Sequence, residues 1–290
     1  MDILFLGTSS GTPTSTRNVS GIAVQESQGK NWYLIDCGEG TQHQIQRTPL
    51  SLATLQAILI THVHGDHCYG LPGLLASAGM NHRTAPLTII APAGIKEWFE
   101  ATQQHTQLYL PFALEFVATE TLNPMPLGQF NVAAIELSHR VPSYAYQFTE
   151  IASHTKLDIN KLKAAGIPQG PLWGQLNKGM DIEFDGQCFK SADFAEVNNQ
   201  PRNIIICGDN DTPEKLKAAS ENCHVLVHEA TYTKDIADKA GDVGHSYAEQ
   251  VARFAEDQAI PNLILTHFSP RYQASPSAPS SIEHIRQEAQ

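Results

Sequence analysis

The sequence predicts a mixed α/β protein built from two similar halves around shared β-sheets. Short apolar runs alternate with glycine turns and helical stretches along the whole chain. Both halves are rich in strands and contain a few helices, which is unlike a simple strand–helix alternation. Five apolar runs also end at a residue able to bind a metal or act in catalysis, which is typical of sites at strand ends.

Ten apolar segments are expected to be strands because they are short, rich in β-branched residues and bounded by turn residues. They are 2–7, 20–25, 31–38, 55–62, 87–92, 130–139, 143–149, 202–209, 224–229 and 262–267. The expected helices cover roughly 40–47, 70–80, 94–105, 213–220, 246–258 and 281–288.

Residues 154–179 do not fit this pattern, because their periodicity is weak and glycine and proline cluster in the middle. An insertion of this length is usually functional or disordered. It contains four lysines and one aspartate, hence +3, which leaves −14 on the rest of a chain whose net charge is −11. Positive charge is therefore concentrated on the insertion.

The totals limit the classes of function. The chain has 290 residues and no apolar run of membrane-spanning length, so no membrane partner is expected. Its first residues lack the basic start of a signal peptide, and its five cysteines have no paired spacing, so we expect reduced thiols and a cytoplasmic protein. The acidic net charge by itself argues against a nucleic-acid partner.

The segment "THVHGDH", residues 61–67, carries the densest chemistry. In extended chain His62 and His64 point to the same side, and Gly65 permits a turn that directs Asp66 and His67 to a neighbouring position. Such a segment can supply two adjacent metals, although a polar loop after a strand is the simpler explanation. Nitrogen and carboxylate ligands suit zinc, manganese or iron.

These residues and their neighbours resemble the ribonuclease Z family of the metallo-β-lactamase superfamily, whose members trim transfer-RNA 3′ ends. The superfamily motif is "HVHGDH". The closer resemblance comes from "LGTSSGTPT", "LIDCGEGTQ", "HGDHCYGLPGLL", "HEAT" and "LILTHFSPRYQ", which occur in the family's order. The resemblance covers nearly the whole chain and implies one domain over 1–290, a four-layer αββα sandwich with a protruding, flexible arm at 154–179.

The resemblance also implies roles for individual residues. Two divalent ions are expected, zinc first and manganese or iron as alternatives. The first would be held by His62, His64 and His139, the second by Asp66, His67 and His267, and both by Asp209. Asp66 would act as general base, and His245, oriented by Glu229, would protonate the leaving oxygen. His228 is expected to have a structural role. The family usually has threonine where this chain has Asn210.

For substrate binding, the resemblance points to Arg271 and to an arm that grips transfer RNA. The arm residues that match are Lys161, Lys163, Gly170, Pro171 and Lys178.

The implied function is an endoribonuclease that leaves a 3′-hydroxyl on transfer RNA and a 5′-phosphate on the trailer, working as a homodimer. The acidic charge keeps open a hydrolase of small phosphodiesters or sulfate esters that ignores RNA. A third hypothesis, a binding protein that has lost catalysis, is opposed by the complete ligand set.

Overall fold

The computed structural model describes residues 1–151, 155–197 and 201–290. They form two compact units, one made of Met1–Phe148 with Asn203–Gln290 and the other of Thr149–Arg202. The larger unit is called the body and the smaller one the inserted unit. No helix in the described residues is long and apolar enough to cross a membrane.

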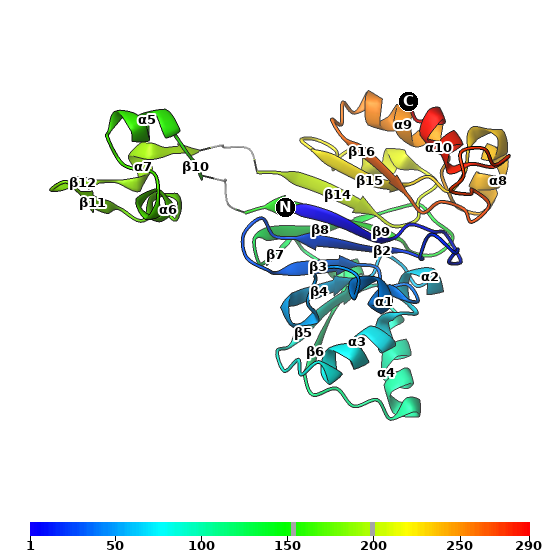
Figure 1. Ribbon diagram of the computed structural model, residues 1–290. Coiled ribbons are helices and arrows are strands. Elements are labelled where there is room, and N and C mark those ends of the chain that lie inside the picture. The colour runs from blue at the N-terminus through cyan, green and yellow to red at the C-terminus, as the bar shows by residue number, and fades with distance from the viewer. Residues whose placement is uncertain (152–154, 198–200) are drawn as a thin grey trace. The chain divides into compact units, whose positions relative to one another are not determined.

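The first half of the body forms a six-stranded sheet in the order β1-β2-β3-β4-β5-β6 (Figure 1). Its strands are β1 Asp2–Gly7, β2 Gly21–Gln25, β3 Trp32–Ile35, β4 Leu55–Leu59, β5 Leu87–Ala91 and β6 Leu114–Ala118. Strands β3 to β6 run parallel, so their carboxyl ends lie at one edge of the sheet.

The second sheet has the order β16-β15-β14-β9-β8-β7. Its strands are β7 Met125–Leu127, β8 Phe130–Glu136, β9 Tyr144–Glu150, β14 Asn203–Cys207, β15 Val225–Glu229 and β16 Leu263–Thr266. Strands β14, β15 and β16 are parallel, which again collects their carboxyl ends.

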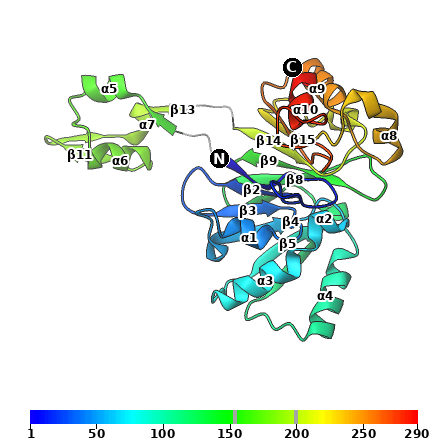
Figure 2. The same cartoon turned by 45° about the vertical axis from the view of Figure 1, so that its right-hand side comes forward.

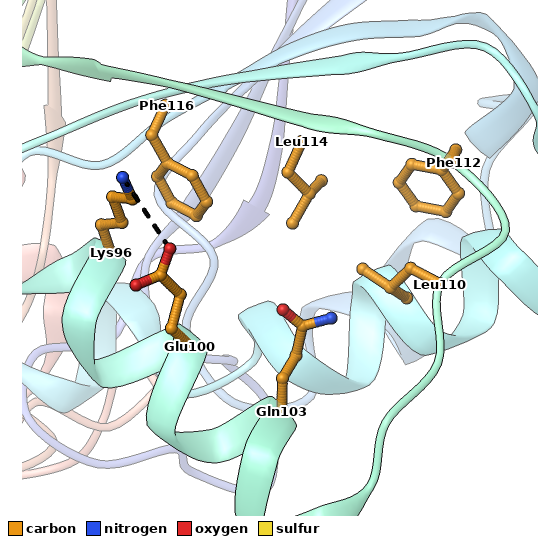
Figure 3. Close-up of a pocket in the computed structure, with 7 residues that line it drawn as sticks. All are labelled: Lys96, Glu100, Gln103, Leu110, Phe112, Leu114 and Phe116. Carbon is orange, nitrogen blue, oxygen red and sulfur yellow. Dashed lines mark ion pairs between the residues drawn. The ribbon is translucent and has the colours of Figure 1, made fainter.

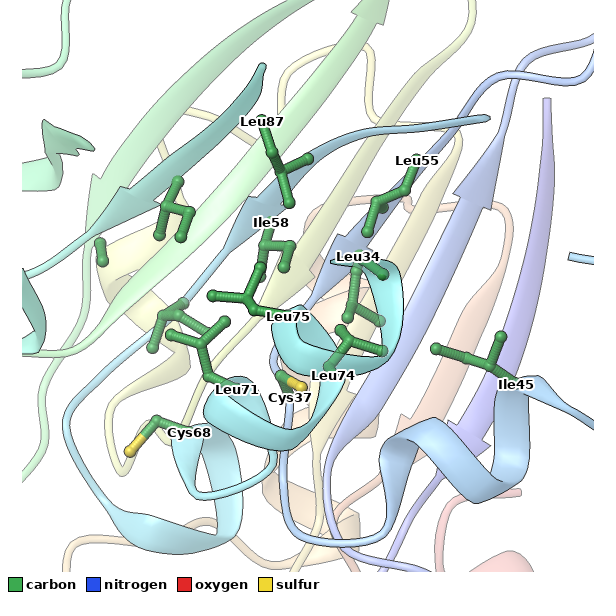
Figure 4. Close-up of a cluster of buried hydrophobic side chains, with 14 of the residues drawn as sticks. Leu34, Cys37, Ile45, Leu55, Ile58, Cys68, Leu71, Leu74, Leu75 and Leu87 are labelled. Carbon is green, nitrogen blue, oxygen red and sulfur yellow. The ribbon is translucent and has the colours of Figure 1, made fainter. Parts of the chain in front are cut away.

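Helices cover the outer faces of both sheets, as Figures 1 and 2 show. The helices of the body are α1 Thr41–Ile45, α2 Gly65–Cys68, α3 Leu71–Met80, α4 Ile95–Thr106, α8 Ala237–Asp242, α9 Ala248–Asp257 and α10 Ile282–Glu288. Three apolar clusters separate the layers. One packs α3 and α4 on the first sheet (Figure 4), one lies between the sheets, and one packs α9 on the second sheet. The body is therefore a four-layer αββα sandwich, as expected.

The alternation along single strands explains the layering. In β3, Tyr33 and Ile35 enter the cluster between the sheets, whereas Trp32 and Leu34 enter the cluster under the helices. Successive side chains point to opposite faces, so a strand buried on both faces must be apolar throughout. All four residues are at most 1% exposed. This is why the strands appear in the sequence as continuous apolar runs.

The inserted unit has its own small core. Its elements are β10 Thr155–Leu157, α5 Ile159–Ala164, α6 Pro171–Asn177, β11 Ile182–Phe184, β12 Gln187–Phe189, α7 Ser191–Phe194 and β13 Ala195–Val197. Leu162, Leu176 and Phe194 are buried together with Ile167 and Ile182. The unit is longer than the insertion expected at 154–179, whose first residue, His154, lies outside the described residues.

The charge of the inserted unit differs from that of the shorter segment. Residues 149–202 contain six lysines and arginines and seven acids, so the net charge is −1. Lys161, Lys163 and Lys178 occur on or directly after α5 and α6, and Lys190 directly follows β12, while Asp181, Glu183 and Asp185 are exposed on or beside the β11–β12 hairpin. The unit is therefore not uniformly basic.

Some elements differ from the expectation. The helix expected over 213–220 is wrong, since only a 3₁₀ turn forms at Pro213–Leu216. Strands β6 and β7 and helices α2 and α8 were not expected. Strand β6, "LEFVA", is an edge strand with a charged residue near its start, so it lacks the continuous apolar run of the inner strands.

Candidate metal centre

Four ligand-type side chains meet where β4, β8 and β14 end. The Nδ1 atom of His64 lies 3.1 Å from Nε2 of His62 and 3.3 Å from Nε2 of His139. Asp209 Oδ2 lies 3.5 Å from Nε2 of His62 and 3.7 Å from that of His139. Three nitrogens and one carboxylate oxygen therefore surround a single point, as the ligands of a bound divalent ion would.

A second group adjoins the first. Nε2 of His67 lies 3.1 Å from Nε2 of His267 and 3.6 Å from Asp66 Oδ2. Asp209 Oδ1 lies 3.4 Å from His67 Nε2 and 3.3 Å from His267 Nε2. The structure thus brings all seven expected ligands together.

Asp209 connects the groups because its two oxygens face different ones. Oδ2 faces His62 and His139, whereas Oδ1 faces His67 and His267. Oδ1 is buried and has no hydrogen-bond partner among the described residues. Burying a carboxylate oxygen without a partner is costly unless a cation offsets its charge. The residues therefore fit a divalent metal at this position.

His67 is held by a carboxylate that the sequence did not single out. Its Nδ1 lies 2.6 Å from Asp36 Oδ2, and the same carboxylate accepts hydrogen bonds from the backbone and hydroxyl of Thr61 at 2.8 and 2.9 Å. Such a bond fixes the ring so that Nε2 faces the metal position. Burial alone would lower the pKa of His67, but Asp36, Asp209 and Asp66 outweigh it and raise the pKa to about 10. This surplus of negative charge favours a cation.

Contacts at Nδ1 orient three of the other imidazoles. Thr61 Oγ1 lies 3.0 Å from His62 Nδ1, and Thr231 Oγ1 lies 3.1 Å from His267 Nδ1. The Gly244 carbonyl lies 2.6 Å from His139 Nδ1. A Cβ at Gly244, whose φ is +78°, would lie 2.8 Å from that same nitrogen. The close approach therefore requires glycine here.

Backbone geometry also places residues of the centre. Asp36 and His267, which directly follow β3 and β16, adopt φ values of 58° and 57°. Residues other than glycine rarely adopt this left-handed conformation, which costs about 1–3 kcal/mol and is concentrated at functional sites. Asp66 is also held from the other side, because the Gly11 amide donates to its Oδ2 at 2.7 Å.

His245 and Glu229 form a pair beside the two groups. Nδ1 of His245 lies 3.0 Å from Glu229 Oε1 and 3.8 Å from Asp209 Oδ2. Burial would lower the pKa of His245, but Glu229 and Asp209 raise it to about 9. Burial would raise the pKa of Glu229, yet His245 lowers it to about 2. Both pKa shifts favour a protonated imidazole held by a carboxylate, which is suited to donating a proton.

Asn210 links the loops behind this pair. Its Oδ1 accepts from the Ser138 amide at 3.1 Å, and its Nδ2 lies 2.9 Å from His228 Nε2. Its backbone amide donates to Glu229 Oε1 at 3.3 Å. His228 is fully buried and its Nδ1 lies 2.7 Å from the Glu229 carbonyl, so it has contacts of a structural kind.

The expected substrate-binding residues are Arg271 in the body and five residues of the inserted unit. The guanidinium of Arg271 lies 5.3 Å from the centroid of the Tyr232 ring, whose centroid is 6.2 Å from that of His245. The other expected contacts, Lys161, Lys163, Gly170, Pro171 and Lys178, are exposed residues of the inserted unit. Lys161 Nζ lies 4.0 Å from Asp158 Oδ2.

A cavity of about 390 Å³ lies between α4 and the chain leading into β6 (Figure 3). Leu110, Phe112 and Leu114 line one side, and the ion pair of Lys96 with Glu100 lies on the helix. It contains none of the ligand-type residues described above, so it is separate from the metal centre.

Comparisons with known proteins agree with this geometry. Residues 1–149 match the model of a family described as "Anti-Pycsar protein Apyc1". The whole chain is similar to a ribonuclease Z of Pseudomonas putida, at 52% identity over 91% of that protein, and to one of Brevibacillus brevis, at 38% identity over 92%. The structure is similar to the short form of human tRNase Z, with a TM-score of 0.68 and 27% identity over 93% of this chain and 94% of that one. The metallo-β-lactamase fold protein YhfI of Bacillus subtilis, at 19% identity and TM-score 0.65 over 99% of this chain and 90% of that one, shares the fold.

Proposed function

Because the chain belongs to the ribonuclease Z family, we propose that it removes the 3′ trailer from precursor transfer RNA. Its residues 1–149 also belong to the Apyc1 family. The chain is a metal-dependent hydrolase, and the reaction is the cleavage of one phosphodiester. Water forms a bond to phosphorus while the bond from phosphorus to the ribose 3′-oxygen breaks. The products are a transfer RNA with a 3′-hydroxyl and a trailer with a 5′-phosphate.

Two divalent ions complete the proposal, with zinc preferred and manganese or iron as alternatives. His62, His64 and His139 would hold one, Asp66, His67 and His267 the other, and Asp209 both. When bound, they would activate water and neutralise charge on the phosphate. The observation that carries this proposal is the buried Oδ1 of Asp209, which has no hydrogen-bond partner in the described part of the chain and faces one group while Oδ2 faces the other.

The protein's own side chains would move the protons. Asp66 Oδ2, held by the Gly11 amide at 2.7 Å, is proposed to accept a proton from the attacking water. His245 is proposed to give a proton to the leaving 3′-oxygen. Its Nδ1 faces Glu229 at 3.0 Å, which leaves Nε2 as the atom that donates.

Binding of the RNA is proposed to use Arg271 and the inserted unit. The position of Arg271 over Tyr232, next to His245, supports a phosphate contact near the scissile bond. The exposed Lys161, Lys163 and Lys178 support an electrostatic contact with phosphates, which positions a nucleic acid without reading its sequence. Gly170, with φ +149° and open space around it, can bring backbone close to a ligand beside Pro171.

A homodimer and a cytoplasmic location, both implied by the family, also belong to the proposal. All five cysteines are free, which supports a reducing compartment. Light scattering should give a mass about twice the 31.7 kDa of one chain.

The test is to incubate the metal-loaded protein with precursor transfer RNA and to identify the ends of both products. A 3′-hydroxyl on the transfer RNA and a 5′-phosphate on the trailer are expected. A chromogenic phosphodiester in a parallel reaction provides the control for an intact centre. Hydrolysis of the small diester with an uncut precursor would instead favour the small-diester hydrolase.

A further inference from the structure

Tyr69 is a large aromatic side chain that the metal centre does not use and the core does not cover. It lies two residues after His67 and is 61% exposed. His67 itself is 2% exposed, and the next residue, Cys68, is also 2% exposed. The chain therefore turns from the buried ligand to an exposed aromatic ring within about half a helical turn.

The Tyr69 ring lies against the half-buried part of the metal-ligand segment 62–67. An added Cβ at Gly65 would lie 2.1 Å from the ring, so the ring lies directly against the Gly65 backbone. Gly65 stands between His64 and Asp66, and all three are half-buried, whereas His62 is fully buried. The solvent-accessible part of the ligand segment is therefore the part that Tyr69 adjoins.

Trp98 of α4 lies beside the Tyr69 ring. The Trp98 ring lies 6.2 Å from that of Tyr69, centroid to centroid, with the planes tilted by 36°. Trp98 is half-buried against the core under α4, so it provides a fixed support. Val63, between two ligands, is 37% exposed. A partly exposed aromatic ring thus lies beside the metal-ligand segment 62–67.

We propose that Tyr69 is a stacking platform for a nucleobase next to the scissile phosphate. This inference rests on the proposed function and extends it from the phosphate to the base. Every nucleobase has a π face, so such a platform binds unpaired nucleotides without selecting a sequence. The arrangement suits this task because the metals would bind the phosphate, and the Tyr69 ring contacts Gly65, which lies between two of the expected metal ligands.

The test combines variants of the protein with variants of the RNA. Tyr69→Ala removes the ring, and Tyr69→Phe keeps the ring without its hydroxyl. Tyr109→Ala is the matched control, because Tyr109 is another tyrosine, 81% exposed, in the loop between α4 and β6. The substrates are a precursor transfer RNA and two versions of it in which the nucleotide on one or the other side of the scissile bond lacks its base.

On the intact precursor, Tyr69→Ala should lower kcat/KM by roughly 5- to 150-fold, the effect of losing one stacked base. Tyr69→Phe and Tyr109→Ala should stay close to the parent. On one abasic precursor, the parent should fall to the level of Tyr69→Ala, and the variant should lose nothing further. That result would also identify the side of the scissile bond on which the base lies.

Two results would overturn the platform. In one, Tyr69→Ala processes the intact precursor as well as the parent does. In the other, its loss is the same on intact and on both abasic precursors, which would assign the ring to another contact. A parent that leaves the precursor uncut would overturn the proposed function and the platform together, so the two failures are distinguishable.

Discussion

Asp209 joins two groups of ligands with one carboxylate. A nearby aspartate, Asp211, shows how a carboxylate in the same loop can instead be hydrogen-bonded by its own loop. Asp211 lies two residues further on, and its Oδ1 accepts a hydrogen bond from the Thr212 hydroxyl. Asp209 Oδ1 has no such partner among the described residues. Asp211 is therefore hydrogen-bonded within its loop, whereas Asp209 Oδ1 is left available to bind a cation.

Asp209→Asn should lower metal affinity and phosphodiesterase activity by more than about 100-fold, since removing even a group behind a ligand costs 10–100-fold. The amide is the same size but cannot balance two cations. Metal content and kcat/KM should be measured side by side with Asp211→Asn, which should resemble the parent. Normal metal content in Asp209→Asn would contradict the bridging role.

Asp36→Asn tests the contact that holds His67. The amide can still reach His67 Nδ1, but it removes a buried charge that raises the pKa of that imidazole. We expect metal affinity about 10–100-fold weaker, with the fold retained. A titration with metal under competition from a chelator measures this directly, and an unchanged affinity would show that Asp36 is structural only.

His245→Ala should lower kcat and kcat/KM together on RNA while metal content stays at the level of the parent. This is the signature of a group that acts only in the transition state. The variant should lose less activity on a substrate with a better leaving group, such as a nitrophenyl phosphodiester, because the leaving oxygen of that substrate needs no proton. Near-normal turnover on RNA would assign His245 to a structural role at the start of α9.

At the scale of elements, the centre depends on two sheets that each present the carboxyl ends of parallel strands at one edge. His62 follows β4 in the first sheet, while Asp209 and His267 follow β14 and β16 in the second. The apolar cluster between the sheets fixes these ends relative to one another. Buried apolar residues far from the metal position therefore control the spacing of the ligands.

Hydrogen bonds between Glu150 and Arg202 join the two ends of the inserted unit. Arg202 Nε donates to Glu150 Oε2 at 2.9 Å, and the Glu150 amide donates to the Arg202 carbonyl at 3.0 Å. A short linker can therefore replace residues 152–200 without separating β9 from β14. No candidate ligand lies in the described part of that range.

We expect the variant with a glycine–serine linker to bind metal and cleave a small phosphodiester as the parent does. Its affinity for precursor transfer RNA should fall, and the salt dependence of binding should flatten by about 0.9 in log–log slope for each phosphate that the protein no longer neutralises. Lys161→Ala with Lys163→Ala should reproduce part of this effect. Neutralising Glu183 and Asp185 should not, which is the matched control. Unchanged RNA affinity in the linker variant would contradict a binding role.

Over the whole molecule, features set by residues that are close in sequence could be predicted, whereas features set by distant residues could not. The ligands at 62–67 share one short segment, and the inner strands are apolar throughout, so both were predictable. Asp36 was missed because its partner lies 31 residues away and only the parallel pairing of β3 with β4 brings them together. The core of the inserted unit was missed because its elements are three to seven residues long, too short for a periodic pattern.

One buried carboxylate, that of Asp209, joins the two groups of ligands into a centre that is proposed to hold two metals. The most direct test is elemental analysis of the purified, metal-loaded chain by mass spectrometry, normalised to protein concentration. We expect close to two divalent transition-metal ions per chain, one for each group of ligands. A chain that reproducibly holds one ion, or none, would contradict it.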